Sequence, residues 1–367
     1  MGLNPPAHAM KTPFSPQLGF DNYALRSLGW KAHQILDHAA SLQLDAVLFS
    51  DFDVYESLAD ADLRDLKRRA DDLGLALYAG MLSICPTSVM FDPRRGSAEE
   101  QLRLCLRIAK ALGSPVARCV LGKVDDRRGP GGIAARIAET VAVLRPMRSE
   151  ALDSGIKIAV ENHAGDLNST ELLELIDMAG RDFVGATLDT GNALWALEEP
   201  LAALETLGPV TVCTGLRDSY LWETPEGATL QWTSIGTGLV DWPAFFRRFA
   251  ELCPNVPVIV ETISGRPIIL PLLRDYFWDA YPRATPQMLA QMLRLARAGE
   301  PREPFTPPPG MGELRAEQAQ QLAELERSLR HCRKVFGELS VNSDGGEQSK
   351  RRSSNPCKSP PVRQSSL

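Results

Sequence analysis

The sequence predicts an α/β protein, a (β/α)8 TIM barrel followed by a C-terminal helical extension. Through the middle of the chain, short β-branched runs alternate with longer amphipathic runs. This alternation predicts a parallel sheet with helices outside it, and several short runs are apolar throughout, as strands buried on both faces are. The short runs number eight, which is the number of strands that closes a barrel of this kind.

The strand-like runs are 18–23, 45–50, 76–82, 116–122, 157–163, 184–190, 210–218 and 256–262. The amphipathic runs predict helices over 30–42, 59–73, 98–112, 133–153, 169–179, 201–207 and 243–253. Asn168 is followed three residues later by Glu171, which is typical of a helix cap, and Asp241 stands just before an early proline, Pro243. The alternative, an open doubly wound sheet, lacks the Gly-x-Gly-x-x-Gly turn after its first strand.

Composition divides the chain into four parts. We expect a disordered N-terminal tail (1–16), the barrel (17–300), a proline-rich linker with a C-terminal helix (301–340) and a disordered tail (341–367). The helix is expected over 314–339, since its apolar residues recur at intervals of four and three. We expect this apolar stripe to dock on the outside of the barrel. The alternative is a seam between two copies in a homo-oligomer.

Charge and cysteine content exclude several classes of protein. A net charge of −6 does not favour a nucleic-acid partner, which needs a clustered basic face, or docking on anionic lipid. The sequence has no apolar run of the length that spans a membrane. The seven cysteines are scattered, without a Cys-x-x-Cys pair, which is typical of a reduced, cytoplasmic protein.

Three of the predicted strands end in a carboxylate. Glu161, Asp189 and Glu261 close strands five, six and eight, and functional groups of a barrel project from the carboxyl ends of its strands. A charge at the end of a buried strand is costly unless it is paired or holds a cation. Oxygen ligands suit Mn²⁺, Mg²⁺ or Co²⁺. The sequence therefore predicts one shared metal or acid–base centre built from these three side chains.

Five further residues near the strand ends are candidates for contacting a substrate: His163, Asn192, Arg217, Asp218 and Trp222. Arg217 carries the fork-shaped group that binds a carboxylate or phosphate, and a structural ion pair with Asp218 is the alternative. Asn192 can bond a substrate hydroxyl. Trp222 can stack on a sugar face or pack within its loop. His163 can contact substrate, support a metal ligand or cap its strand.

Four blocks of sequence resemble the xylose-isomerase-like barrel superfamily, and within it the sugar phosphate isomerase/epimerase group. The blocks are Val160-Glu161-Asn162-His163-Ala164-Gly165, Leu188-Asp189-Thr190-Gly191-Asn192, Gly236-Thr237-Gly238-Leu239-Val240-Asp241-Trp242 and Val260-Glu261-Thr262. The resemblance covers about residues 17–300. It implies a divalent metal held by four side chains from strands five to eight, of which Glu161, Asp189 and Glu261 are present. It also implies that Glu161 and Glu261 are catalytic, moving protons on opposite faces of a sugar whose carbonyl the metal polarises.

The fourth ligand of the family pattern is missing. The superfamily usually places a histidine, sometimes a glutamine, on strand seven, in a pattern such as His-Leu-Lys-Asp. Here the corresponding stretch reads Gly215-Leu216-Arg217-Asp218, so that the ligand position falls on a residue without a side chain. Water, His163 or Asp218 could complete the coordination. The alternative is a degenerate site with weakened or lost metal binding.

We therefore expect a divalent-metal-dependent isomerase or epimerase of a small sugar, keto-sugar or sugar acid, acting through an enediolate. One alternative is a metal-dependent decarboxylase or lyase of a 3-oxo sugar acid, in which Arg217 holds the carboxylate. Another is a degenerate barrel that only binds a ligand. A DNA repair nuclease of the same superfamily is not expected, since strands three and four end without the histidines that such enzymes use.

Overall fold

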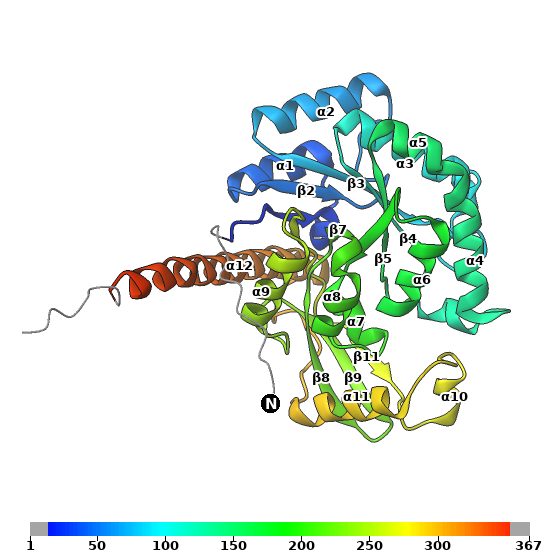
Figure 1. Ribbon diagram of the computed structural model, residues 1–367, viewed down its shortest axis with the longest axis vertical. Coiled ribbons are helices and arrows are strands. Elements are labelled where there is room, and N and C mark those ends of the chain that lie inside the picture. The colour runs from blue at the N-terminus through cyan, green and yellow to red at the C-terminus, as the bar shows by residue number, and fades with distance from the viewer. Residues whose placement is uncertain (1–13, 353–367) are drawn as a thin grey trace, which may run out of the picture.

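The predicted barrel is confirmed by the computed structural model, which describes residues 14–352 and the side chains of residues 14–341. Eight parallel strands form one sheet in the order β10-β1-β2-β3-β4-β5-β6-β7, surrounded by helices (Figure 1). The strands are β1 (Leu18–Asp21), β2 (Ala46–Phe49), β3 (Ala76–Ser83), β4 (Val116–Val120), β5 (Lys157–Glu161), β6 (Val184–Leu188), β7 (Thr211–Thr214) and β10 (Val258–Val260). Each falls on one of the runs predicted from the sequence.

The ring of strands is completed by a single residue beyond β7. The Leu216 N–H donates to the Ile259 carbonyl (2.7 Å), and the Leu216 carbonyl accepts from the Glu261 N–H (2.9 Å). Leu216 thereby forms a parallel bridge with Val260. β7 itself ends at Thr214, earlier than the predicted run, because the chain beyond it stays in the barrel only through the isolated bridge at Leu216. β7 and β10 are therefore neighbours, and their carboxyl ends face the same opening.

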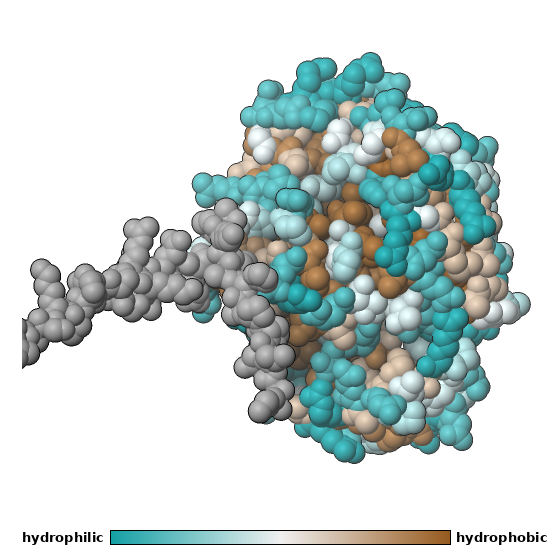
Figure 2. Space-filling model, viewed as in Figure 1, coloured by the Kyte–Doolittle hydropathy of each residue, from teal (hydrophilic) through white to brown (hydrophobic). Residues whose placement is uncertain are grey.

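The predicted helices form the outer layer, but the run 133–153, expected as one helix, is divided into two by a 3-10 helix, Arg145–Met147, that contains a proline. Hydrophilic residues cover much of the rim of the molecule, and hydrophobic residues gather toward the middle of the face shown in Figure 2. The α-helices are α1 (Ala32–Ser41), α2 (Asp60–Asp72), α3 (Ala98–Leu112), α4 (Gly132–Leu144), α5 (Arg148–Ser154), α6 (Ser169–Ala179), α7 (Thr190–Trp195), α8 (Pro200–Leu207), α9 (Trp242–Leu252), α10 (Asp275–Trp278), α11 (Pro286–Ala298) and α12 (Glu313–Arg352). Both predicted caps are confirmed: Asn168 accepts from the Glu171 N–H (2.9 Å) and Asp241 from the Ala244 N–H (3.0 Å).

The barrel interior changes from apolar to charged along the strands. One buried cluster comes from six barrel strands: Ala46, Leu48, Tyr78, Val116, Ala159, Cys213 and Ile259. Because side chains alternate between faces along a strand, a residue two positions further on points to the same interior. Arg118 follows Val116 in this way, Glu161 follows Ala159, and Glu261 follows Ile259. The carboxyl ends of the strands therefore carry a layer of charged residues above an apolar floor.

A second, three-stranded sheet lies outside the barrel and was not expected from the sequence. The antiparallel strands β8 (Asp218–Thr224) and β9 (Gly227–Thr233) form a hairpin, and β11 (Pro267–Leu270) pairs with β9. Figure 1 shows this sheet with α10 and α11 below the barrel. It has its own small core, which includes Leu221, Leu230, Leu270 and Met292. The sheet holds the chain that leaves β7 close to the barrel opening.

Helix α12 docks on the barrel, as its apolar stripe predicts. Leu325, Leu329 and Cys332 belong to the same buried core as the barrel strands and outer helices. Gln321 also accepts from the Ser27 N–H (3.0 Å) and hydroxyl (2.6 Å), in the 3-10 helix η1 (Asn22–Leu28) that follows β1. The helix continues to Arg352, past the predicted end. No helix within residues 14–352 is both long and apolar enough to cross a membrane.

The two expected tails lie largely outside the described residues, which exclude 1–13 and 353–367. Phe14, placed in the expected N-terminal tail, is instead buried. Its ring contacts Phe336 of α12 edge-on, with 5.3 Å between ring centroids, and that of Phe246 of α9 at 6.2 Å. The start of the described chain is therefore held between α9 and α12.

Replacing Leu329 with alanine tests how firmly α12 is part of the barrel core. Leu329 is only 1% exposed, so we expect the free energy of unfolding in urea to fall by about 2–4 kcal/mol. Leu314→Ala on the same helix is the matched control, because Leu314 is 61% exposed, and it is expected to leave stability nearly unchanged. Equal small effects of both substitutions would mean that α12 is not needed for the barrel's stability.

Candidate functional site

The three predicted carboxylates meet at the carboxyl end of the barrel. Oxygen atoms of Glu161, Asp189 and Glu261 all lie within 4.8 Å of one another, and the three residues are buried. Glu161 is the last residue of β5, Asp189 directly follows β6, and Glu261 directly follows β10. The carboxylates therefore approach one point from three strands. We call these three side chains the carboxylate cluster.

Asp189 is fixed in the carboxylate cluster by the start of α7. Its Oδ1 accepts from the N–H groups of Gly191 (2.8 Å) and Asn192 (3.0 Å), as the cap of that helix. Asn162 also binds the Asp189 backbone on both sides, accepting from its N–H (2.8 Å) and donating to its carbonyl (2.8 Å). Asp189 Oδ2 is thereby turned toward the other two carboxylates. Burial raises the pKa of Asp189, and the Arg217 guanidinium opposes that rise.

Arg118 neutralises one member of the carboxylate cluster. Its Nε and Nη2 lie 2.7 and 2.6 Å from Glu161 Oε2, and its Nη1 donates to the Met81 carbonyl (3.1 Å). The other oxygen, Glu161 Oε1, accepts a long hydrogen bond from the Asn192 amide (3.4 Å). Arg118 was not among the site residues expected from the sequence. The sequence feature that could have identified it is an arginine within the otherwise apolar strand Val116–Val120. A charge buried there needs a partner.

Arg217 bridges the other two members of the carboxylate cluster. Its Nη2 is in contact with Asp189 Oδ2 and lies 2.6 Å from Glu261 Oε2. The guanidinium also stacks on Trp232, 4.6 Å from the ring centroid. Arg217 is only 2% exposed. The expected grip on a substrate anion would therefore require the guanidinium to leave the two protein carboxylates.

Four buried carboxyl groups share this site with two guanidinium groups. Asp21, at the end of β1, is a fourth buried carboxylate. It accepts from the Ser50 hydroxyl (2.6 Å) and the Tyr23 N–H (2.8 Å) through Oδ1, and its Oδ2 has no hydrogen-bond partner among the described residues. Burial, reinforced by the charge of Glu261, raises the pKa of Asp21 to about 8. A further negative charge is therefore costly at this site, and a bound cation would lower that cost.

Gly215 points at the centre of the carboxylate cluster. A Cβ atom built on Gly215 would lie 3.1 Å from Glu261 Oε2, 3.7 Å from Asp189 Oδ2 and 4.0 Å from Glu161 Oε2. The structure thus places position 215 where a fourth ligand would project, although glycine supplies none. The donors that are present, three clustered carboxylates, fit a hard divalent cation. Arg217 lies between two of them.

His163 and Asn192 border the carboxylate cluster. The Asn192 amide donates to Asp189 Oδ2 (2.8 Å), and its Oδ1 has no hydrogen-bond partner among the described residues. His163 Nδ1 lies 2.7 Å from the Gly122 carbonyl. Burial, followed by the charge of Arg118, lowers the pKa of His163 to about 4. The imidazole is therefore neutral near pH 7, with Nδ1 donating to the carbonyl and Nε2 left as an acceptor.

The structure places Asp218 and Trp222 away from the carboxylate cluster. Asp218 Oδ2 accepts from the N–H groups of Gly236 (3.0 Å) and Gly238 (3.1 Å) and from the Trp242 indole (2.8 Å), so it organises the loop before α9. Trp222 lies in β8, opposite Thr229 of β9. The tryptophan that reaches the cluster is Trp232, whose indole donates to the Gly191 carbonyl (3.0 Å).

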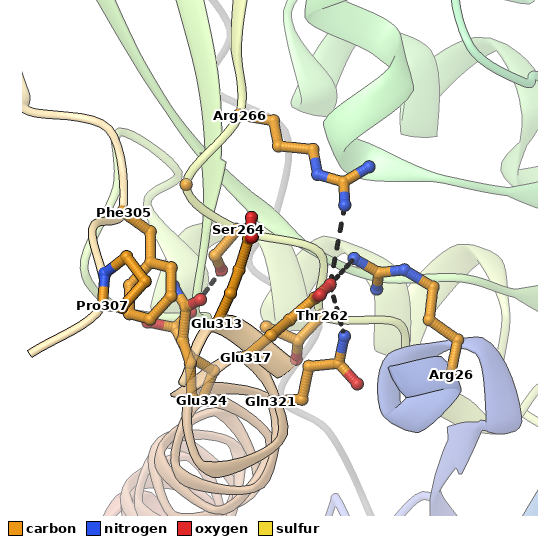
Figure 3. Close-up of a pocket in the computed structure, with 12 residues that line it drawn as sticks. Arg26, Thr262, Ser264, Arg266, Phe305, Pro307, Glu313, Glu317, Gln321 and Glu324 are labelled. Atoms are coloured by element: carbon orange, nitrogen blue, oxygen red, sulfur yellow. Dashed lines mark hydrogen bonds and ion pairs between the residues drawn. The ribbon is translucent and has the colours of Figure 1, made fainter. Parts of the chain in front are cut away.

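A cavity of about 150 Å³ lies between the loop after β10 and α12, and none of the three clustered carboxylates lines it. Figure 3 shows Arg26 and Arg266 pointing at the same carboxylate, that of Glu317, with Nη2 to Oε1 distances of 3.5 Å in both cases. Thr262, which follows Glu261 in the chain, also lines this cavity. Helix α12 therefore forms one wall of a polar opening next to the carboxyl end of β10.

Comparison with known families finds a match over most of the barrel. Residues 27–292 match the profile of a family described as the xylose isomerase-like TIM barrel. Among curated proteins, a 3-oxo-isoapionate decarboxylase from Pectobacterium atrosepticum is 25% identical over 230 residues, which cover 62% of this chain and 76% of the relative.

Solved structures with the same fold include two sugar epimerases. An L-ribulose 3-epimerase superposes with a TM-score of 0.56 at 14% identity, covering 94% of this chain and all (100%) of the other. A D-allulose 3-epimerase from Methylomonas sp. gives 0.54 at 19% identity, covering 88% and 100%. The IOLI protein, solved with a zinc atom, gives 0.54 at 17% identity, covering 76% and 95%. At these identities the likeness concerns the fold alone.

Proposed function

Because this chain belongs to the xylose isomerase-like TIM barrel family, we propose that it is an isomerase or epimerase of a small sugar, keto-sugar or sugar acid. The reaction moves a proton at a carbon next to a carbonyl group and passes through an enediolate. The observation that carries the proposal is the buried carboxylate cluster, which brings Glu161, Asp189 and Glu261 together from three strands. The shared fold of sugar epimerases supports the substrate class.

A divalent cation, Mn²⁺, Mg²⁺ or Co²⁺, is part of this proposal. Glu161, Asp189 and Glu261 would hold it, and the excess of buried carboxylates over guanidinium groups favours its binding. When bound, a divalent cation polarises a carbonyl group and acidifies the neighbouring C–H. The IOLI protein, which shares the fold, was solved with a bound zinc atom, which supports a divalent cation as part of the proposal.

Glu161 and Glu261 are the proposed catalytic carboxylates. They come from the fifth and eighth barrel strands, so they approach the cluster from different sides. One removes the proton and the other returns it on the opposite face of the substrate, which changes the configuration at that carbon. Asn192, whose amide already holds Asp189, has a free Oδ1 to accept from a substrate hydroxyl. His163 Nε2 is a second acceptor at the same opening.

A second candidate function is decarboxylation of a 3-oxo sugar acid, which the similarity to 3-oxo-isoapionate decarboxylase favours. Loss of CO₂ from such an acid leaves an enolate, so the same electrophilic site serves both reactions. In this reaction a cationic group would orient the substrate carboxylate. Arg217 is the proposed group, and it would have to exchange Asp189 and Glu261 for the substrate.

Incubation with keto-sugars and 3-oxo sugar acids in D₂O, with Mn²⁺ or Mg²⁺ added, separates the two functions. The proposed isomerase or epimerase is expected to incorporate deuterium next to the carbonyl without releasing CO₂, because its proton exchanges with solvent while held on a carboxylate. Release of CO₂ would instead establish the decarboxylase. Absence of both in every metal-supplemented reaction would favour a barrel that only binds a ligand.

A further inference from the structure

Arg217 occupies the place that a cation would take between two members of the carboxylate cluster. Its Nη2 is in contact with Asp189 Oδ2 and lies 2.6 Å from Glu261 Oε2. A divalent cation draws carboxylate oxygens to about 2.0–2.6 Å, so it needs the same two oxygen atoms at nearly the same distance. Gly215 leaves the space beside them open, since a Cβ atom there would lie only 3.1 Å from Glu261 Oε2.

The position of Arg217 is built by several neighbours. Thr190 Oγ1 accepts from the Arg217 N–H (3.0 Å) and donates to the Arg217 carbonyl (2.6 Å). Gly191 makes room for the side-chain stem, because a Cβ atom there would lie 2.2 Å from Arg217 Cγ. Trp232 covers the guanidinium at 4.6 Å. Three independent features therefore direct this arginine toward Asp189 and Glu261.

We propose that Arg217 and the divalent cation exclude each other at Asp189 and Glu261. Arg217 is the resident counter-ion of the metal-free site, and the cation binds only by displacing its guanidinium. Two positive groups cannot share the same pair of oxygens, since their repulsion at this distance in a buried site exceeds what either gains from partial contact. Arg118 differs from Arg217 in that it pairs with one carboxylate of the cluster, Glu161, and does not bridge two. The inference rests on the metal that the proposed function requires.

The displaced arginine would stay at the site. Thr190 holds its backbone on both sides, so only the side chain moves, and the guanidinium is released at the barrel opening with its charge unpaired. There it can bind a carboxylate or phosphate group of a substrate in a bidentate way. Binding of the cation would thus make Arg217 available to an anionic substrate.

Titration of Mn²⁺ into chelator-treated protein, followed by calorimetry, tests this exclusion. Arg217→Met removes the competing charge while keeping most of the stem, so we expect Mn²⁺ to bind at least about a hundredfold more tightly than to the wild type. The matched control is Arg127→Met. Arg127 is likewise buried, pairs with Glu171 and stacks on Tyr281 at 4.4 Å, but it lies outside the cluster. It is expected to leave Mn²⁺ affinity unchanged.

Thermal unfolding gives a second readout that does not depend on activity. Without metal, Arg217→Met is expected to melt below the wild type, because Asp189 and Glu261 lose their counter-ion. Mn²⁺ is then expected to raise its melting temperature more than that of the wild type or of Arg127→Met. Arg217→Gln, which keeps a hydrogen-bond donor, serves the same comparison if the methionine variant does not fold.

Equal Mn²⁺ affinity of the wild type and the Arg217 variants would overturn the exclusion while leaving the proposed enzyme intact. Absence of Mn²⁺ binding in all of them would remove both the exclusion and the metal from the proposed function. Deuterium incorporation in the presence of chelator would then establish whether the carboxylates act without a cation. The two proposals therefore fail in different ways.

Discussion

Replacing Glu261 with glutamine is expected to lower kcat by at least about a thousandfold on any substrate that the wild type converts. Glutamine keeps the size of the side chain but neither accepts a proton at neutral pH nor provides a negative ligand. Because Glu261 directly follows β10 and lies in the carboxylate cluster, the substitution removes one proposed proton acceptor and one proposed metal ligand together. The measurement is steady-state kinetics with Mn²⁺ or Mg²⁺ present.

Glu198→Gln is the matched control for Glu261→Gln. Glu198 is a mostly buried carboxylate that accepts from the Ser169 N–H (3.0 Å) and hydroxyl, at the start of α6 and outside the carboxylate cluster. It is expected to retain wild-type kcat. A Glu261→Gln enzyme that kept more than about a tenth of the wild-type kcat would contradict a role in proton transfer.

Glu161→Gln tests the other proposed catalytic carboxylate. Because Glu161 is likewise a proposed proton acceptor and a proposed metal ligand, we expect Glu161→Gln to lower kcat to a similar extent in the same kinetic assay.

Replacing Asp218 with alanine is expected to lower the free energy of unfolding by about 3–5 kcal/mol, the cost of leaving buried partners without their charged acceptor. Asp218 is buried, and its Oδ2 accepts from Gly236, Gly238 and the Trp242 indole. Two of these donors lie in the loop before α9 and the third is the first residue of α9, so the loop would lose its anchor. Unfolding in urea, followed by circular dichroism, measures the loss.

Asp241→Ala is the comparison for Asp218→Ala in the same loop. Asp241 is an exposed helix cap, accepting from the Ala244 N–H, and its loss is expected to cost only about 1 kcal/mol. If Asp218→Ala kept wild-type stability but raised KM, Asp218 would instead be the substrate contact that the sequence predicts.

The barrel and its carboxylates could be predicted because each depends on a local pattern. A strand buried on both faces is an apolar run, and a carboxylate at its end is visible in the sequence, as in Val258-Ile259-Val260-Glu261. Position in the barrel order then brings the three acids together. The positions of the three acids at strand ends thus predicted that they form one cluster, and the structure supplied the distances between their oxygen atoms.

The counter-ions and the second sheet could not be read from the same pattern. Arg118 lies inside an apolar run, and only the pairing of β4 with β5 places it beside Glu161. The stretch 210–218 looks like one strand, because the break at Gly215 and Leu216 depends on bridging to Val260 across the ring. The place of Arg118 beside Glu161 and the end of β7 before Gly215 both depend on contacts between residues far apart in sequence. A local sequence pattern does not show such contacts.

The docking of α12 has a consequence for the order in which the molecule is made. The helix hydrogen-bonds through Gln321 to η1, directly after the first strand, and its residues Leu325 and Leu329 complete the core of the barrel. During synthesis, all eight strands leave the ribosome before this helix does. Part of the apolar surface of the nascent barrel therefore stays exposed to solvent until residues 325–329 have been made, and such transiently exposed surface favours aggregation.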